Sequence, residues 1–189
     1  MGGGDKTLLT LDGRPLLTHV IDRLRPQVDA LALNANGDPA RFAAFGLPIA
    51  PDTIGDFAGP LAGILAGLVW ARRQPQVPAA IVTAAADTPF FPTDLADRLG
   101  AAAANRKGLA VARTNGRLHP VFGYFPIVCA EHLDDFLWHS GSRKVTDWLA
   151  RVGFTAVDFA GGEGVRDPFF NINTHADLET AERWIAGAN

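Results

Sequence analysis

The chain has 189 residues, of which 48% are hydrophobic and 20% are charged, so it can form a globular domain with a sizeable core. Its net charge of -3 gives no basic footprint for nucleic acid, and its single cysteine, Cys129, excludes an internal disulfide and a cysteine-based zinc cage. No apolar run reaches the roughly 18 residues of a membrane-spanning helix, and the N-terminus lacks the pattern of a signal peptide. We therefore expect a cytoplasmic protein that binds neither nucleic acid nor a membrane.

The chain opens with three glycines, residues 2–4, followed shortly by Lys6. Glycines let the backbone approach a ligand closely, and a lysine ammonium is a point charge suited to phosphate. Gly3, Gly4 and Lys6 are therefore candidate phosphate contacts. A frayed terminus is the alternative, and composition alone favours it, although the apolar residues 8–11 begin an ordered segment directly afterwards.

Three short apolar segments, which we predict to be strands, each lead into a polar side chain: Asn34 after residues 31–33, Asp52 after residues 48–50 and Asp87 after residues 80–86. In open α/β sheets the carboxyl ends of parallel strands meet along one edge, and ligands bind there. We therefore expect these three side chains to meet at that edge, with Lys6 entering from the glycine loop.

Asp87 has two interpretations on this evidence. A carboxylate at a strand end can ligate a divalent metal on a phosphate substrate. It can equally be a cap or turn residue before the next helix. Asn34 and Asn36 also have two interpretations. Their two amides can bracket a polar ligand, but the sequence Asn-Ala-Asn is also common in ordinary turns.

Helices are predicted where apolar residues recur at helical spacing, at residues 15–24, 61–72, 93–105, 127–138, 144–152 and 176–185. Gly63 and Gly67 lie on one face of the second of these helices, four residues apart. Glycines inside a helix cost about 1 kcal/mol each relative to alanine, so close packing against the sheet or a ligand would be needed to justify them.

Further strands are predicted at residues 109–112 and 154–159, and Asn115-Gly116 between the first of these and its return arm is a hairpin signal. Strands and helices otherwise alternate. The pattern predicts an α/β fold, formed as a single domain over residues 1–189, with helices on both faces of a mostly parallel sheet and one antiparallel insertion.

Two further polar sites lie in the second half of the chain. Asn171 and Asn173 are two residues apart in an extended segment, so they share a face, with Ile172 opposite. Arg143 and Lys144 lie in a polar, basic loop between two predicted helices. Without further context, a solvated connection is the simpler interpretation of that loop.

Taken in order, the motifs resemble one family over nearly the whole chain: Gly-Gly-Gly-Asp-Lys, Leu-Asp-Gly-Arg-Pro-Leu-Leu, Asn-Ala-Asn, Asp52 with Gly-Pro-Leu-Ala-Gly, Ala-Asp-Thr-Pro, His-Pro-Val and Phe-Asn-Ile-Asn-Thr. Each motif is weak by itself, but the ordered set is similar to that of the molybdenum cofactor guanylyltransferases. The resemblance implies a three-layer, Rossmann-like nucleotidyltransferase fold. It also implies transfer of GMP from Mg-bound GTP to molybdopterin cofactor, with release of pyrophosphate.

The resemblance carries residue roles with it. It implies that GTP is bound by Gly3, Gly4, Lys6, Asn34, Asp52 and Asp87. Within this set Lys6 and Asp87 are catalytic, Asp87 is the Mg²⁺ ligand, and Asn34 and Asp52 contact the guanosine end. The pterin side falls on Asn171, Asn173, Arg143 and Lys144. The implied partners are GTP, molybdopterin cofactor and proteins that supply or receive that cofactor.

One departure from the family pattern lies at the N-terminus. Family members open with a strand and a Leu-Ala-Gly-Gly loop, of which this sequence holds only the tail, and we expect the absent strand to be a central one in such a sheet. This leaves two other functions to weigh. One is a nucleotidyltransferase of the same fold that uses CTP or acts on a sugar phosphate. The other is a non-catalytic homologue that binds nucleotide or pterin.

Overall fold

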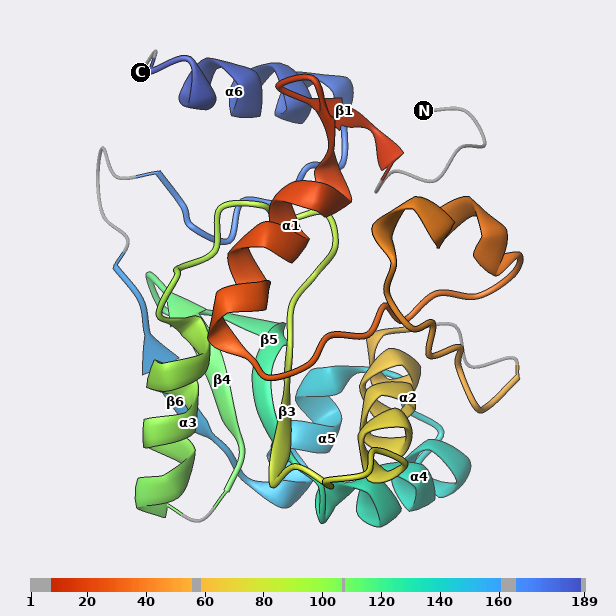
Figure 1. Cartoon of the computed structure of the whole chain (residues 1–189). Helices are drawn as coiled ribbons and strands as arrows, with labels where there is room; N and C mark the ends of the chain where they lie inside the picture. The colour runs from red at the N-terminus through yellow and green to blue at the C-terminus, as the bar shows by residue number, and fades with distance from the viewer. Residues whose placement is uncertain (1–7, 56–58, 107, 161–165, 188–189) are drawn as a thin grey trace.

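The computed structural model describes residues 8–55, 59–106, 108–160 and 166–187 (Figure 1). The predicted phosphate contacts Gly3, Gly4 and Lys6 lie outside these described residues, so their roles stay predictions.

A four-stranded sheet with strand order β3-β5-β4-β6 forms the centre of the fold. The strands are β3 (Ala80–Thr83), β4 (Ala110–Thr114), β5 (Arg117–Pro126) and β6 (Thr155–Asp158). β5 runs antiparallel to both β3 and β4, whereas β4 and β6 are parallel. β3, β4 and β6 therefore point in the same direction, and β5 is the predicted antiparallel insertion.

The turn between β4 and β5 explains why the insertion forms where it does. Asn115 and Gly116 have backbone φ angles of 47° and 77°, both in the left-handed region that a type I′ hairpin turn requires. Asparagine and glycine tolerate this region better than other residues. The Asn-Gly signal in the sequence thus predicted the hairpin correctly.

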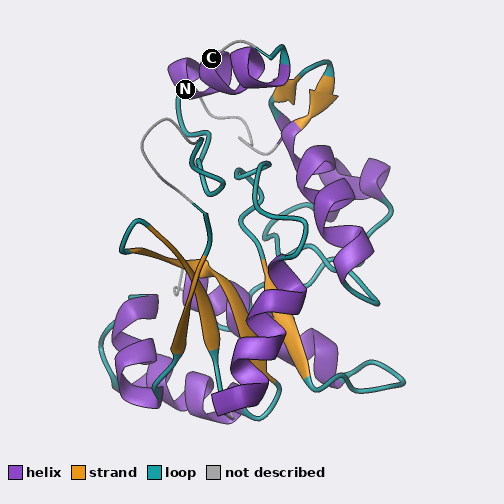
Figure 2. Cartoon of the chain, turned by 90° about the vertical axis from the view of Figure 1, so that its left-hand side faces the viewer, coloured by secondary structure: helices purple, strands orange, loops and turns teal. Residues whose placement is uncertain are grey.

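Helices cover both faces of the sheet (Figures 1 and 2). On one face lie α2 (Pro60–Arg72), α4 (Cys129–His139) and α5 (Val145–Val152); on the other lie α1 (Leu16–Leu24) and α3 (Leu95–Arg106). The side chains of β4 alternate accordingly: Val111 is buried against the first group of helices, and Ala110 and Ala112 against the second. The predicted three-layer α/β architecture is confirmed. Within the described ranges, no helix is both long enough and apolar enough to cross a bilayer.

A smaller unit lies at the end of the molecule away from the sheet (Figure 2). It consists of the hairpin β1 (Thr10–Leu11) and β2 (Arg14–Pro15), together with α6 (His175–Ile185). Leu11, Leu16, Ile172 and Leu178 form its buried cluster. Because Ile172 is a member, the predicted Asn171–Asn173 segment is anchored by its central residue.

The segments predicted as strands at residues 31–33 and 48–50 pair with each other, but through a single bridge. Leu33 and Ile49 form an isolated parallel bridge. The Leu33 N–H donates to the Pro48 carbonyl, and the Ala50 N–H donates to the Leu33 carbonyl, both at 2.9 Å. The pairing direction matches the prediction for this part of the chain, and it brings the residues that follow each segment side by side.

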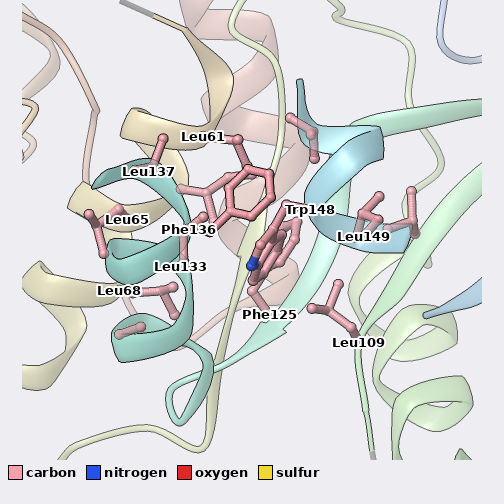
Figure 3. Close-up of a cluster of buried hydrophobic side chains, with 14 of the residues drawn as sticks. Leu61, Leu65, Leu68, Leu109, Phe125, Leu133, Phe136, Leu137, Trp148 and Leu149 are labelled. Atoms are coloured by element: carbon pink, nitrogen blue, oxygen red, sulfur yellow. The ribbon is translucent and has the colours of Figure 1, made fainter. Parts of the chain in front are cut away.

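Trp148 is the largest side chain of the core between the sheet and helices α2, α4 and α5 (Figure 3). It has no exposed surface, lies 6.0 Å from the Phe125 ring, and donates from Nε1 to His132 Nδ1 at 3.1 Å. Replacing it with alanine would leave a large cavity and a histidine without its donor.

We expect Trp148→Ala to lower the free energy of unfolding by about 3–5 kcal/mol, measured by urea denaturation. Trp138→Ala is the matched control, because Trp138 on α4 is 60% exposed. The control is expected to change the free energy of unfolding by less than about 1 kcal/mol. Equal losses in the two variants would contradict the packing described here.

Candidate functional site

The first part of the site is a hydrogen-bonded group formed by Asn34, Asn36 and Asp52. Asn34 Nδ2 donates to Asp52 Oδ1 and to the Ala50 carbonyl, both at 2.9 Å. Asn36 Nδ2 donates to the other carboxylate oxygen, Asp52 Oδ2, at 2.7 Å, and Asn36 Oδ1 accepts from the Asp52 N–H at 2.9 Å. The parallel Leu33–Ile49 bridge therefore does what the sequence predicted: it places Asn34 and Asp52 in contact.

The loop that follows Asn36 is built by its own local sequence. Gly37 has a φ of 80°, which lets the chain turn immediately after Asn36. Asp38 then caps the 3₁₀ helix η3 (Pro39–Phe45) by accepting from the Ala40 N–H at 2.9 Å. Arg41 reaches back and donates to the Asn36 carbonyl. The Asn-Ala-Asn motif thus leads into a turn and also presents side-chain amides that could contact a ligand.

Gly63 in α2 lies directly beside Asn34. A Cβ atom on Gly63 would be 2.5 Å from Asn34 Oδ1, closer than non-bonded atoms approach, so any larger residue would displace the Asn34 amide. The other helix glycine has a different neighbour, because a Cβ on Gly67 would meet Ile81 Cδ1 at 2.9 Å. Gly67 therefore allows close packing on the sheet, and Gly63 allows close packing on a predicted ligand residue.

Asp87 lies in a turn that follows β3. The Thr88 N–H donates to the Ala85 carbonyl at 3.3 Å, and the Thr88 hydroxyl lies 3.4 Å from Asp87 Oδ1. Helix α3 begins only at Leu95, so Asp87 is a turn residue and does not cap that helix. Its side chain is half-buried. The carboxylate therefore lies in the turn that follows β3, a position that fits a turn residue and also a metal ligand.

The turn that carries Asp87 is linked both to the segments that carry Asn34 and Asp52 and to the Asn171–Asn173 segment. On one side, the preceding Ala86 packs in the same apolar cluster as Leu33 and Ile49. On the other side, the Asp87 carbonyl accepts from the Ile172 N–H at 2.9 Å. The fold thereby links Asp87 to two polar sites that are distant from it in the sequence.

Asn171 and Asn173 point as the sequence predicted. Both are exposed, whereas Ile172 between them is fully buried. The segment is continued by a capping box, in which Asp177 Oδ2 accepts from the Asn173 and Thr174 N–H groups at 2.9 and 2.7 Å. The hydrogen bond from the Thr174 side chain lowers the pKa of Asp177 most, and the two from the Thr174 and Asn173 N–H groups lower it further. The start of α6 therefore holds the backbone at Asn173.

His119 supports this segment and was not among the predicted site residues. Its ring stacks on Phe169 with the centroids 4.5 Å apart, and its Nε2 lies 2.7 Å from the Thr114 hydroxyl oxygen. Burial lowers the pKa of His119, an effect that the nearby charge of Asp167 opposes. The His-Pro-Val motif in the sequence was the available signal for this residue.

Arg143 and Lys144 lie in a different part of the molecule from Asn171 and Asn173. Helices α2 and α4 run antiparallel, because Arg72 at the end of α2 contacts the Ile127 carbonyl at 3.3 Å and the Glu131 carboxylate at 3.4 Å near the start of α4 (Figure 3). The loop after α4 therefore lies near the start of α2, the end of that helix beside Asn34.

That loop is also a hydrogen-bonded turn in its own right. Ser142 Oγ donates to Asp147 Oδ2 at 2.6 Å and accepts from the Lys144 N–H at 3.2 Å. Arg143 and Lys144 are exposed beside it. The turn keeps two cations at this edge, which is compatible with contact to a substrate phosphate and equally with a solvated connection.

The donor set around Asp87 suits a hard divalent cation. Mg²⁺ is commonly held by one or two carboxylates together with substrate phosphates, with no dedicated protein cage. Among the residues that the structure describes, no three His, Cys, Asp or Glu side chains are grouped to hold a metal. A half-buried carboxylate with a neighbouring hydroxyl, at the end of a strand, fits the single-carboxylate mode.

Comparisons with known proteins show which family the chain is similar to. A family model described as the MobA-like NTP transferase domain matches residues 1–152. The chain is 50% identical over 187 residues to a molybdenum cofactor guanylyltransferase from Mesorhizobium japonicum, covering 98% of this chain and 89% of that protein. A protein of the same name from a Bradyrhizobium species is also 50% identical over 187 residues, covering 98% of this chain and 87% of that one.

A solved structure shares the fold. Molybdopterin-guanine dinucleotide biosynthesis protein A from Archaeoglobus fulgidus matches with a TM-score of 0.74 at 23% identity, covering 98% of this chain and 92% of that one. At this identity the likeness shows the fold, and the family assignment rests on the family model and the relatives. On that basis the chain belongs to the family of MobA-like NTP transferases.

Proposed function

We infer that this chain transfers GMP from GTP to molybdopterin cofactor and releases pyrophosphate, as the names of its relatives indicate. A single nucleotidyltransferase domain over residues 1–189 is proposed to carry the activity. The observation that best supports this proposal is that the turn carrying Asp87 is linked both to the segments of Asn34 and Asp52 and to the Asn171–Asn173 segment. A transferase needs such an arrangement, with a metal-binding carboxylate between a nucleotide site and an acceptor site.

Asp52 and Asn34 are proposed to contact the guanosine end of GTP. A carboxylate accepts from two adjacent donors, and guanine offers such a pair in its N1–H and its exocyclic amine. Adenine presents a different pattern at the same edge. Asn34 contacts the Asp52 carboxylate directly, so the two residues act at one place.

Asp87, Lys6, Gly3 and Gly4 are proposed to serve the triphosphate. Asp87 is the proposed Mg²⁺ ligand, and bound Mg²⁺ would offset the negative charge on the phosphates. The glycine loop and Lys6 are proposed to contact the same phosphates, in keeping with the resemblance described above. Phosphoryl and nucleotidyl transfer depend mainly on positioning and charge neutralisation, and these residue types supply both.

The chemical step is proposed to be an in-line displacement at the α-phosphorus of GTP. The terminal phosphate of molybdopterin attacks, a new P–O bond forms, and the bond between the α- and β-phosphates breaks as pyrophosphate leaves. A phosphate monoester is already anionic at neutral pH, so the reaction requires no general base. The protein therefore has to align two anions, and the residues around Asp87 are suited to that task.

Asn171 and Asn173 are proposed to bind the pterin, whose edge offers several donors and acceptors that match amides. Both residues are exposed, and the N–H of Ile172 between them donates to the Asp87 carbonyl. Arg143 and Lys144 are proposed to add positive charge for the pterin phosphate, which would then extend from Asn171 and Asn173 toward the start of α2.

Pyrophosphate release from GTP in the presence of molybdopterin cofactor and Mg²⁺ tests the proposed function. The same assay with CTP tests the alternative, a cytidylyltransferase of the same fold. We expect turnover with GTP to exceed turnover with CTP clearly, and the guanine dinucleotide cofactor to appear as product by mass spectrometry. Binding of either substrate without pyrophosphate release would overturn the enzymatic proposal in favour of a binding protein.

The variant Gly63→Ala tests whether Asn34 contributes to GTP binding without lowering the stability of the fold. Alanine favours helix by about 1 kcal/mol over glycine, so the variant is expected to remain folded. Its new methyl group would displace the Asn34 amide from Asp52. Loss of one hydrogen bond to a charged group predicts a KM for GTP raised roughly ten-fold. Gly67→Ala is the control, since it meets only the end of Ile81, and a GTP KM raised equally in both variants would refute this role for Gly63.

A further inference from the structure

Asn36 is held to Asp52 more tightly than Asn34 is. Its side-chain amide makes two hydrogen bonds to one residue: Oδ1 accepts from the Asp52 N–H at 2.9 Å, and Nδ2 donates to Asp52 Oδ2 at 2.7 Å. One amide therefore fixes both the backbone and the carboxylate of Asp52. Asn34 contacts the other oxygen, Oδ1, at 2.9 Å.

This arrangement sets the orientation of the carboxylate. A carboxylate attached through a single Cβ–Cγ bond rotates readily, because the last torsion of aspartate has broad minima. Here each oxygen accepts one hydrogen bond from the protein, one from Asn34 and one from Asn36. An ionised carboxylate offers about four acceptor sites, so roughly one on each oxygen remains for a ligand. The two carboxylate oxygens of Asp52, held in one plane, can therefore accept from two adjacent donors on a ligand.

Asn36 is itself anchored to the core. Its carbonyl accepts from the Arg41 guanidinium, which also lies 4.8 Å above the ring of Phe42. Phe42 is 4% exposed and packs with Leu17 and Ile21 of α1. A continuous set of contacts thus runs from the apolar core through Arg41 and Asn36 to the Asp52 carboxylate.

We propose that Asn36 is a positioning residue that sets selectivity for guanine by fixing the plane of the Asp52 carboxylate. The proposal rests on the proposed function, because it takes Asp52 to be the group that contacts the base. Asn36 itself needs no contact with the nucleotide. Its contribution is the orientation of two acceptors toward the N1–H and the exocyclic amine of guanine.

The test compares GTP with inosine triphosphate, which keeps the N1–H but lacks the exocyclic amine. Equilibrium binding of each nucleotide by calorimetry, together with kcat and KM, is measured for the wild-type protein and for Asn36→Ala. We expect the preference for GTP over inosine triphosphate to fall about ten-fold, through the KM for GTP, with kcat little changed. Asn36 is exposed, so the variant is expected to fold.

Two further variants make the result specific. Asn36→Asp keeps the acceptor for the Asp52 N–H but replaces the donor to Oδ2 with a like charge, so it should lose at least as much preference. Asp29→Asn changes an exposed aspartate ahead of the same segment and outside the contacts that run from Arg41 to Asp52, so it should keep the preference.

An unchanged preference in Asn36→Ala, or an equal loss in Asp29→Asn, would overturn the positioning role while leaving the enzyme active. The proposed function fails separately, through a wild-type protein that releases no pyrophosphate from GTP. In that case the calorimetric preference of the wild-type and variant proteins still decides whether Asn36 orients Asp52 toward guanine.

Discussion

Replacing Asp87 with asparagine is expected to lower the rate of GMP transfer on the order of 10³-fold, because the proposed metal ligand would lose its charge. Asparagine has nearly the same shape, and the turn at residues 85–88 is formed by the backbone. The variant should therefore fold, with its stability nearly unchanged. Single-turnover pyrophosphate release at saturating GTP and Mg²⁺ measures the effect on the chemical step.

Asp94→Asn is the matched control for this prediction. Asp94 lies in the connection between β3 and α3, is exposed, and forms an ion pair with Arg98 at 3.7 Å. Exposed pairs of this kind contribute at most about 1 kcal/mol to stability, and the variant should transfer GMP at the wild-type rate. If Asp87→Asn also kept the wild-type rate, Asp87 would not be the metal ligand.

Asp52→Asn is expected to lower kcat/KM for GTP on the order of 10²-fold, since two hydrogen bonds from guanine to a charged acceptor would be lost or weakened. The asparagine NH₂ would also have to face one of the two side-chain amides that now donate to Asp52, Asn34 Nδ2 at 2.9 Å or Asn36 Nδ2 at 2.7 Å. Steady-state kinetics with GTP measures the loss.

The control for this second prediction is Asp29→Asn, an exposed aspartate ahead of the segment that carries Asn34. It removes the same charge from the same region of the chain and should leave kcat/KM for GTP unchanged. A similar loss in both variants would mean that net charge, and not contact with guanine, accounts for the effect of Asp52→Asn.

The helices could be predicted closely because local signals define them. The helix predicted at residues 61–72 is Pro60–Arg72 in the structure, and that predicted at 176–185 is His175–Ile185. Proline at the first helical position and the Thr174 capping box are encoded within a few residues of the helix end. Such boundaries depend little on the rest of the fold.

The site could be predicted in part. The polar residues after apolar segments predicted Asn34, Asp52 and Asp87 as candidate site residues. The alternation of side chains in an extended segment predicted that Asn171 and Asn173 share a face. The partners could not be predicted, because they depend on contacts between distant residues. The bond between the Ile172 N–H and the Asp87 carbonyl joins residues far apart in the sequence. The close approach of Asn34 to Gly63 likewise requires α2 to be in place.

The hydrogen bond between Ile172 and Asp87 has a consequence for how side-chain substitutions at this site are interpreted. It is made by two main-chain groups, so replacing the Asp87, Asn171 or Asn173 side chain leaves it intact. Substitutions of these side chains are therefore expected to leave the spacing between the proposed metal ligand and the two amides unchanged. Proline at position 172 is the exception, because it lacks the N–H that makes this bond. Substituting these side chains changes the groups that contact the two substrates, while the backbone that sets the distance between the two substrate sites stays the same.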